Sequence, residues 1–224
     1  MAKKLFITAT GTDVGKTYLT ALLVKKLRQA GRNAGYYKAA LSGAKRRGTR
    51  LIPGDAEYVK RQAGLEHAAE ELVSYIYETA VSPHLAAELE ENPVELSKVK
   101  EDFQRICGIF DYVTAEGSGG ILCPVRRNLL MMEDIIKALD CPILIVAPAE
   151  LGTINHTILT IEYARSREME VKGVILNWFH KGNAMEEDNL RFIEEYTGVP
   201  VIACAEENAR DLEIEPERLA ALYR

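Results

Sequence analysis

Short apolar runs alternate with longer segments of helical spacing along the whole chain. The apolar runs are nearly continuous, which is typical of parallel strands buried on both faces. They cover residues 5–8, 33–38, 112–116, 143–147, 174–177 and 199–203. Helical spacing predicts helices over residues 16–30, 55–63, 83–91, 97–107, 132–139, 153–166 and 184–196. Alternating strands and helices predict an α/β fold, with a doubly wound, mostly parallel sheet flanked by helices.

The chain contains no internal repeat, low-complexity segment or long linker, so we expect a single domain over residues 1–224. Its length and its hydrophobic content of 47% are sufficient for one large core. Residues 40–54 form a long, glycine-bearing and basic connection. Connections of this length are often functional loops, although a solvated surface loop fits the charge equally well.

The charge balance limits the kinds of partner that the protein can bind. The chain has 28 basic and 33 acidic residues, a net charge of −5, which offers no field for nucleic acid or an anionic membrane. It has neither an apolar run of about eighteen residues nor a secretory signal pattern. The four cysteines lack the C-x-x-C spacing of a metal site. We therefore expect a cytoplasmic protein with reduced thiols.

A loop of glycine, threonine and aspartate follows the first strand and ends in Gly15-Lys16-Thr17, where the first helix begins. A strand, this loop and a helix in that order are typical of a P-loop. Backbone N–H groups and a helix N-terminus suit the phosphates of a nucleotide, with Lys16 on the terminal phosphates and Thr17 on Mg²⁺. Thr10 replaces the usual first glycine, so a plain glycine-bearing turn with an exposed lysine is the alternative.

Charged side chains are also expected at the ends of two other strands. Lys38 would lie near Lys16, and two ammonium groups around one phosphate suit phosphoryl transfer. Asp55, Glu116 and Thr17 together provide the oxygen ligands that Mg²⁺ prefers. Two simpler interpretations stay open at this point: an exposed lysine at the end of its strand for Lys38, and a helix N-cap for Asp55.

Asn177 closes a further predicted strand. Its side-chain amide has both a donor and an acceptor, which could recognise the edge of a nucleobase. An asparagine that starts a turn is the equally simple alternative.

The motifs, in their order along the chain, resemble those of the dethiobiotin synthetase family, within the P-loop NTPase superfamily. The resemblance covers about residues 3–203. Its least generic parts are Glu-Gly-Ser-Gly-Gly at 116–120 and Leu-Gly-Thr-Ile-Asn-His at 151–156. The other matching motifs are Gly-Thr-Asp-Val-Gly-Lys-Thr at 11–17, Tyr-Lys at 37–38, Ser-Gly at 42–43, Gly-Asp-Ala at 54–56, Ser-Pro-His at 82–84 and Asn177.

The resemblance implies a reaction in which one amine of 7,8-diaminononanoate and CO₂ form a carbamate. ATP, as co-substrate, phosphorylates the carbamate, and the second amine closes a ureido ring and expels phosphate. It also implies Mg²⁺ and a homodimer, with the carboxylate tail of the substrate bound at the interface near residues 152–155 of the second subunit. A helix N-terminus near Thr153 suits that carboxylate.

The resemblance also implies a role for each site residue. The catalytic residues would be Lys16 and Lys38. The nucleotide-binding residues would be Asp13, Val14, Gly15, Lys16, Thr17, Tyr18 and Asn177, of which Asn177 would read adenine. The substrate-binding residues would be Thr12, Lys38, Ser42, Gly152, Thr153 and Asn155. The metal ligands would be Thr17, Asp55 and Glu116.

The chain departs from the family pattern at several positions. Ala9 and Gly11 stand where the family usually has glycine and aspartate, and Ala39 stands where proline is common. Residues 203–206 replace a Gly-x-x-Pro pattern that frames the nucleobase, so the preferred base stays open. The stretch 43–54 is also more basic than expected.

Three alternative functions follow from the P-loop alone. The first is a related P-loop synthase that acts on a different amine. The second is a switch ATPase of the ParA or MinD kind, although that class has a signature lysine where this chain has Gly11. The third is a catalytically inactive nucleotide-binding protein, which would have no need to keep Lys16, Lys38, Asp55 and Glu116 together.

Overall fold

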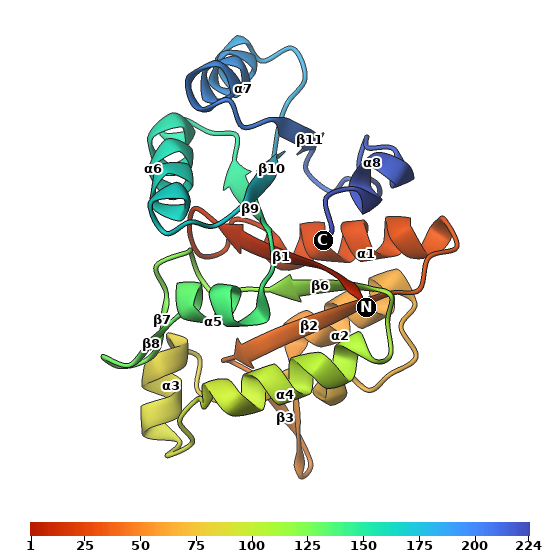
Figure 1. Ribbon diagram of the computed structural model, residues 1–224, viewed down its shortest axis with the longest axis vertical. Helices are drawn as coiled ribbons and strands as arrows, with labels where there is room; N and C mark the ends of the chain where they lie inside the picture. Colours follow the sequence, from red (N-terminus) through yellow and green to blue (C-terminus); the bar gives the residue numbers. More distant parts are fainter.

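The computed structural model describes residues 1–224 and contains a sheet of seven strands, in which all neighbouring strands are parallel (Figure 1). The strand order is β11-β10-β9-β1-β6-β2-β5. The strands are β1 (Lys3–Ala9), β2 (Ala34–Leu41), β5 (Val73–Ile76), β6 (Tyr112–Glu116), β9 (Ile143–Pro148), β10 (Val171–Asn177) and β11 (Val201–Ala205). The predicted doubly wound parallel sheet is confirmed.

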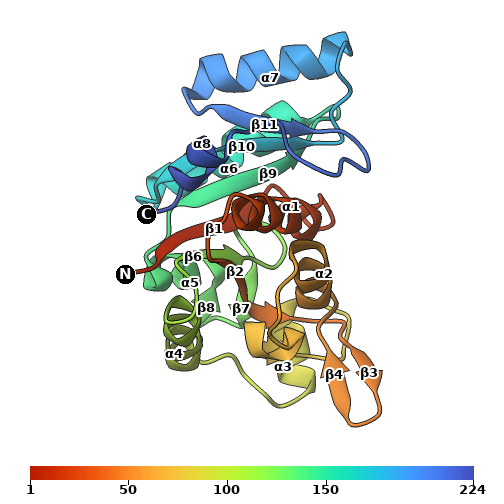
Figure 2. The ribbon, with the colours of Figure 1, turned by 90° about the vertical axis from the view of Figure 1, so that its right-hand side faces the viewer.

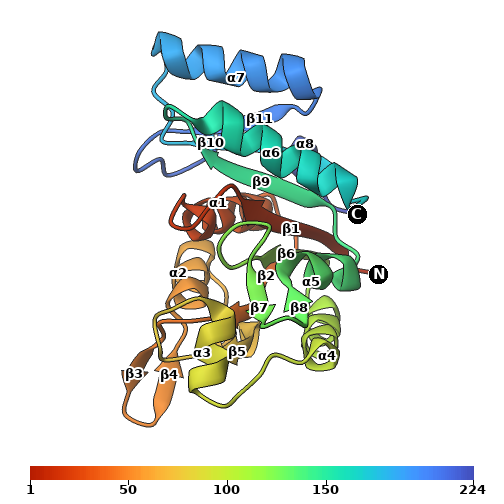
Figure 3. The ribbon, with the colours of Figure 1, turned by 90° about the vertical axis from the view of Figure 1, so that its left-hand side faces the viewer.

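Helices cover both faces of the sheet. Helices α1, α2 and α8 lie on one face (Figure 2), and α4, α5 and α6 lie on the other (Figure 3). Helix α7 packs against α6 and contacts the edge strand β11. The helices are α1 (Lys16–Gln29), α2 (Gly54–Ala63), the 3₁₀ helix η1 (Ala69–Leu72), α3 (Pro83–Leu89), α4 (Leu96–Cys107), α5 (Met132–Leu139), α6 (Thr153–Ser166), α7 (Ala184–Thr197) and α8 (Pro216–Ala220). These two layers bury every residue of β2 and β9, and all but the first residue or two of β1, β6 and β10, which explains their continuous apolar character.

None of the helices combines the length and the apolar character that crossing a bilayer requires. The longest, α1, α6 and α7, contain 14 residues each. A transmembrane helix needs about 20 predominantly apolar residues.

Edge strand β5 was not predicted from the sequence. Its side chains alternate between buried and partly exposed positions, so it lacks the continuous apolar run by which the inner strands were recognised. Strand β2 also extends beyond the predicted end at residue 38, because Ala40 and Leu41 pair with β5. An edge strand is covered less completely than an inner one, and its sequence pattern is correspondingly weaker.

The connection over residues 40–54, expected to be a loop, contains regular structure. Strands β3 (Lys45–Arg47) and β4 (Arg50–Ile52) form an antiparallel hairpin there, and Gly48 has the positive φ of 61° that its turn requires. A second hairpin, β7 (Pro124–Arg126) with β8 (Leu130–Met131), was also missed. Strands of two or three residues are too short to produce a recognisable pattern.

The register of the central strands brings their carboxyl ends together. Ile7 of β1 and Lys38 of β2 both pair with Glu116 of β6. The loop that follows β1, the end of β2 and the end of β6 therefore meet at one edge of the sheet, which is where open α/β sheets bind their ligands.

Candidate functional site

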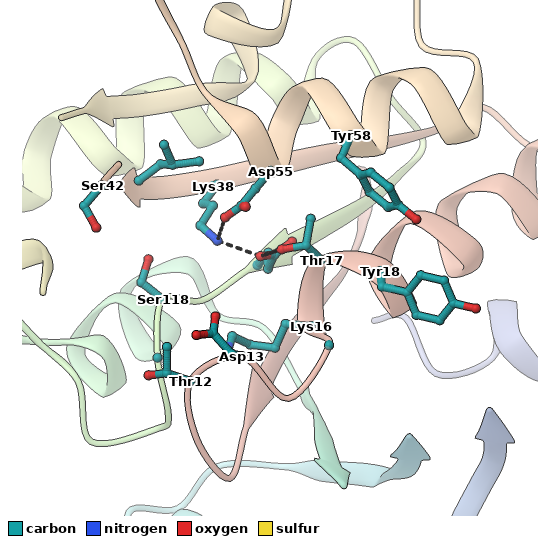
Figure 4. Close-up of a pocket in the computed structure, with 14 residues that line it drawn as sticks. Thr12, Asp13, Lys16, Thr17, Tyr18, Lys38, Ser42, Asp55, Tyr58 and Ser118 are labelled. Carbon is teal, nitrogen blue, oxygen red and sulfur yellow. Dashed lines mark hydrogen bonds and ion pairs between the residues drawn. The ribbon is translucent and has the colours of Figure 1, made fainter. Parts of the chain in front are cut away.

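A cavity of about 670 Å³ lies at this edge, between the loop after β1, the end of β2, the start of α2 and the end of β6 (Figure 4). Its lining is mostly polar and charged, as a phosphate-bearing ligand requires. The cavity brings together most of the residues singled out in the sequence, namely Thr12, Asp13, Gly15, Lys16, Thr17, Tyr18, Lys38, Ser42, Asp55 and Glu116.

The loop after β1 has the backbone geometry of an anion cradle. Asp13 and Gly15 both have positive φ, at 57° and 94°, and α1 begins directly afterwards at Lys16. No side chain caps α1, and its first turn contains no acidic residue. The N–H groups and the positive end of the helix dipole therefore remain available to an anion at this point.

Gly15 is required by its surroundings as well as by its backbone angle. A Cβ at this position would overlap Nδ2 of Asn177 and lie 3.2 Å from its Cγ. Asn177 ends β10 and is buried, and its Nδ2 donates to the carbonyl oxygen of Val14 at 3.0 Å. Its Oδ1 has no hydrogen-bond partner. The amide of Asn177 thus supports the loop through one of its two N–H groups, and its acceptor is left without a partner.

Lys16 lies against this loop rather than in solvent. Its side chain is buried, and its Nζ donates to the carbonyl oxygen of Gly11 at 2.8 Å. Burial and the neighbouring ammonium group of Lys38 lower the pKa of Lys16 to about 8. A turn with an exposed lysine, the alternative to a P-loop, is therefore excluded.

Lys38 lies between two carboxylates (Figure 4). Its Nζ donates to Glu116 Oε1 at 2.6 Å and to Asp55 Oδ2 at 2.7 Å. The Thr17 hydroxyl donates to the same Glu116 oxygen at 2.8 Å. Burial alone would lower the pKa of Lys38, but the carboxylates of Glu116 and Asp55 outweigh it and hold this pKa above its usual range. Lys38 is therefore a charged, buried residue and not an exposed lysine at the end of a strand.

Asp55 does not cap a helix. Helix α2 begins at Gly54 after Pro53, and no side chain forms a capping hydrogen bond there. The Asp55 carboxylate binds Lys38 instead. The N-cap interpretation left open by the sequence is thus wrong, and the side chain belongs to the cavity.

The donor set fits a divalent ion such as Mg²⁺. The oxygens of Thr17, Asp55 and Glu116 converge around Lys38 Nζ (Figure 4). No group of three or more His, Cys, Asp or Glu side chains gathers anywhere in the structure. A metal at this point would therefore take few protein oxygens and complete its coordination with phosphate and water, as Mg²⁺ does in nucleotide sites.

Gly152, Thr153 and Asn155 do not line the cavity. They lie at the start of α6, where Gly152 has a φ of 95° and no side chain caps the helix. Thr153 is buried, whereas Asn155 is exposed. Within one subunit, the structure therefore does not bring these predicted substrate-binding residues together with Lys38.

Sequence reasoning missed several residues that belong to the cavity or its walls. Tyr58 and Ser118 line it, and the buried Tyr36 donates its hydroxyl to Glu116 Oε2 at 3.1 Å. Tyr58 lies one helical turn after Asp55, and Tyr36 lies on the same strand face as Lys38. Those two spacings are the signals that could have identified them.

The lowered pKa of Lys16 predicts a pH dependence. We expect ADP binding in the presence of EDTA to weaken above about pH 8, because Lys16 loses its charge in the free protein. A bound phosphate would raise the pKa of Lys16 above its value in the free protein. Between these two pKa values, the dissociation constant for ADP should rise with pH, by at most about tenfold per pH unit. Calorimetry in buffers of different ionisation enthalpy would detect the proton uptake. A Lys16→Arg control should be less sensitive to pH, and an unchanged wild-type affinity from pH 7 to 9 would contradict this assignment.

Comparison with solved structures identifies the fold class. A chain of the MinC:MinD cell division protein complex of Aquifex aeolicus superposes with a TM-score of 0.59 and 18% identity, covering 93% of this chain and 83% of that chain. A ParA family ATPase of Chlorobium tepidum superposes with a TM-score of 0.58 and 15% identity, covering 99% and 90%. At such low identity the likeness concerns the fold alone, which is that of P-loop NTPases.

Sequence comparison is far more specific. A family model described as an AAA domain matches residues 3–213. An ATP-dependent dethiobiotin synthetase of Clostridium botulinum is 48% identical over an alignment of 225 positions, which covers 100% of this chain and 99% of the relative. One of Brachyspira hyodysenteriae is 51% identical over 205 residues, which are 90% and 91% of the two chains. With the P-loop, the paired lysines and the paired carboxylates in one cavity, this protein belongs to the dethiobiotin synthetase family.

Proposed function

We propose that this protein closes the ureido ring of dethiobiotin from 7,8-diaminononanoate and CO₂, with ATP converted to ADP and phosphate. The observation that carries the proposal is the convergence of Lys16, Lys38, Asp55 and Glu116 over a P-loop, in a chain that belongs to this family. One amine attacks CO₂ and loses a proton to give a carbamate. A carbamate oxygen then attacks the γ-phosphorus and releases ADP. The second amine attacks the carbamoyl carbon, expels phosphate and loses its proton.

The charges in the cavity support this sequence of steps. Carbamate and γ-phosphate are both anions, so cations must lie where they meet. Lys16 would hold the terminal phosphates, and Lys38 would neutralise the carbamate and the transferring phosphoryl group. The substrate amines act as nucleophiles, so the protein has no need to provide one. Thr12 and Ser42, on either side of the cavity, would orient the diamine end.

Thr17, Asp55 and Glu116 would hold Mg²⁺, which neutralises the phosphates when bound. In this structure, the carboxylates of Asp55 and Glu116 accept from Lys38, and Glu116 also accepts from the Thr17 hydroxyl. Metal binding therefore requires Lys38 to release at least one carboxylate. This release would free its ammonium group for the carbamate.

The rest of the nucleotide would lie along the loop and the start of α1. The phosphates and the ribose would contact Asp13, Val14 and Tyr18. The Oδ1 of Asn177, which has no partner in this structure, would accept a hydrogen bond from the amino group of adenine. The Tyr18 hydroxyl donates to the carbonyl oxygen of Ala209, which holds the chain after β11 beside this helix.

A homodimer would complete the substrate site. Leu151, Asn155 and Leu159 are spaced four residues apart, and both leucines are largely exposed, at 83% and 61%. Asn155 and Leu159 share one face of α6, and Leu151 lies just before the helix, so exposed leucines flank Asn155 along the chain at the start of α6. The carboxylate tail of the substrate would bind there, at Gly152, Thr153 and Asn155 of the second subunit.

The dimer can be tested with a matched pair of variants. We expect sedimentation equilibrium to give twice the chain mass of 24.9 kDa. Leu159→Glu should dissociate the dimer and raise the KM for the diamine. Leu89→Glu changes a leucine of almost equal exposure (60%) on α3. This control should remain a dimer and keep the wild-type KM for the diamine. A wild-type monomer with full activity would refute the shared site.

The reaction itself is tested by incubating the protein with ATP, Mg²⁺, bicarbonate and 7,8-diaminononanoate and following dethiobiotin by mass spectrometry. We expect dethiobiotin and ADP in equal amounts, and neither product without the diamine. Steady ATP hydrolysis that ignores the diamine would favour a switch ATPase instead. ADP formed only with another diamine would identify a related synthase.

We also propose a single cytoplasmic domain, supported by the family match over residues 3–213 and by four free cysteines.

A further inference from the structure

The two oxygens of the Glu116 carboxylate have different partners. Oε1 faces the cavity, where it accepts from Lys38 at 2.6 Å and from Thr17 at 2.8 Å. Oε2 faces the interior of the protein and accepts from the Tyr36 hydroxyl at 3.1 Å. This hydroxyl is the one hydrogen-bond donor recorded on Oε2. The rotation of the carboxylate is thus determined from both sides.

The sheet register explains why Tyr36 reaches this oxygen. Strands β2 and β6 are parallel neighbours in which Tyr36 pairs with Thr114 and Lys38 pairs with Glu116. Residues two apart on a strand point to the same face. Tyr36 and Lys38 therefore lie on one face of β2 and bind opposite oxygens of the same carboxylate.

Burial gives the Tyr36 contact its importance. Tyr36 is 0% exposed and Glu116 is 1% exposed, so in this structure the phenol, and not bulk water, satisfies Oε2. The Tyr36 hydroxyl donates to this oxygen from within the protein interior. Without it, Oε2 would be a buried carboxylate oxygen lacking any donor, and the carboxylate would turn toward other partners.

We propose that Tyr36 is a positioning residue for the divalent metal: by binding Oε2, it holds Oε1 of Glu116 toward the metal position. This inference rests on the metal site of the proposed function. Tyr36 would touch neither metal nor substrate and would act only through Glu116. Hydrogen bonds to the far side of a ligating group commonly set both its orientation and its affinity for a metal.

The test is the affinity of the ADP complex for Mn²⁺, measured by electron paramagnetic resonance of the free ion. We expect Tyr36→Phe to raise the Mn²⁺ dissociation constant by about tenfold or more. ADP affinity in EDTA should be unchanged. In turnover assays, the variant should need more Mg²⁺ for half-maximal rate and recover most of the wild-type kcat at saturating Mg²⁺.

Tyr37→Phe is a matched control, because Tyr37 is the next residue on β2 and is equally buried. Its hydroxyl bonds Ser74 Oγ at 2.7 Å and donates to the carbonyl oxygen of Val99 at 3.1 Å, away from Glu116. This variant also removes a buried hydroxyl, so any loss of stability should be similar. Its Mn²⁺ affinity should equal that of the wild type.

Glu116→Gln separates this inference from the proposed function. If Glu116→Gln leaves Mn²⁺ binding intact, the proposed metal site is wrong. Suppose instead that Glu116→Gln weakens Mn²⁺ binding, while Tyr36→Phe binds Mn²⁺ as tightly as the wild type or no more weakly than Tyr37→Phe. The metal site then stands, and the role of Tyr36 is overturned. A Tyr36→Phe protein whose loss of turnover persists at saturating Mg²⁺ would also overturn it.

Discussion

Dethiobiotin formation is expected to fall by about 10³-fold when Lys38 is replaced by methionine, because Lys38 is the group assigned to neutralise both the carbamate and the transferring phosphoryl group. Methionine keeps the length of the side chain but removes its charge. ADP affinity should change far less, since Lys16 and the loop remain. Product formation under saturating substrates measures the effect directly.

The same variant should bind divalent ions more tightly in the absence of nucleotide. Lys38 donates to both Asp55 and Glu116 in this structure, so a metal must compete with its ammonium group for these oxygens. Removing the ammonium leaves the buried Glu116 uncompensated, which should destabilise the fold by roughly 3–5 kcal/mol. Added Mg²⁺ should raise the melting temperature of Lys38→Met much more than that of the wild type. Equal metal affinity in the two proteins would contradict this competition.

Gly15→Ala is expected to lower ADP affinity by about 100-fold, because a displaced loop would lose roughly 3 kcal/mol of hydrogen bonding to the charged phosphates. The new methyl group would overlap Asn177 Nδ2 and force it away from the carbonyl oxygen of Val14 that it now binds. The positive φ of 94° adds strain of about 1–2 kcal/mol for any residue with a Cβ. Calorimetric titration with ADP measures the first effect, and chemical unfolding measures the second.

Gly31→Ala separates steric overlap from backbone strain. Gly31 also has a positive φ, 76°, but nothing lies within 4 Å of a Cβ built there. Its replacement should reduce stability by a similar strain energy and leave ADP binding unchanged. Gly15→Ala combined with Asn177→Ala should recover part of the lost affinity, because the overlapping group is gone. A Gly15→Ala protein that binds ADP like the wild type would refute the proposed geometry of the loop.

The sequence by itself determined the features that depend on neighbouring residues. A strand, Gly15-Lys16-Thr17 and a helix follow each other directly, so local propensity and the 3.6-residue period sufficed to predict the P-loop and the layered α/β fold. The inner strands were recognisable because burial on both faces demands continuous apolar runs. Edge strand β5 and the hairpin β3–β4 are not buried on both faces and need no such apolar run, so they were missed.

Tertiary structure decided every contact between distant segments. Lys38, Asp55 and Glu116 were candidates in the sequence, but it is the register of β2 on β6 that places Lys38 beside Glu116 and the packing of α2 on β2 that brings Asp55 to it. The same register gives Tyr36 its contact with Glu116, whereas the local spacing places Tyr36 only on the strand face of Lys38. Asn177 meets the loop at Gly15 because the chain folds β10 back to within two strands of β1. Residues so far apart in sequence become neighbours only through strand order, and strand order depends on the packing of the whole sheet.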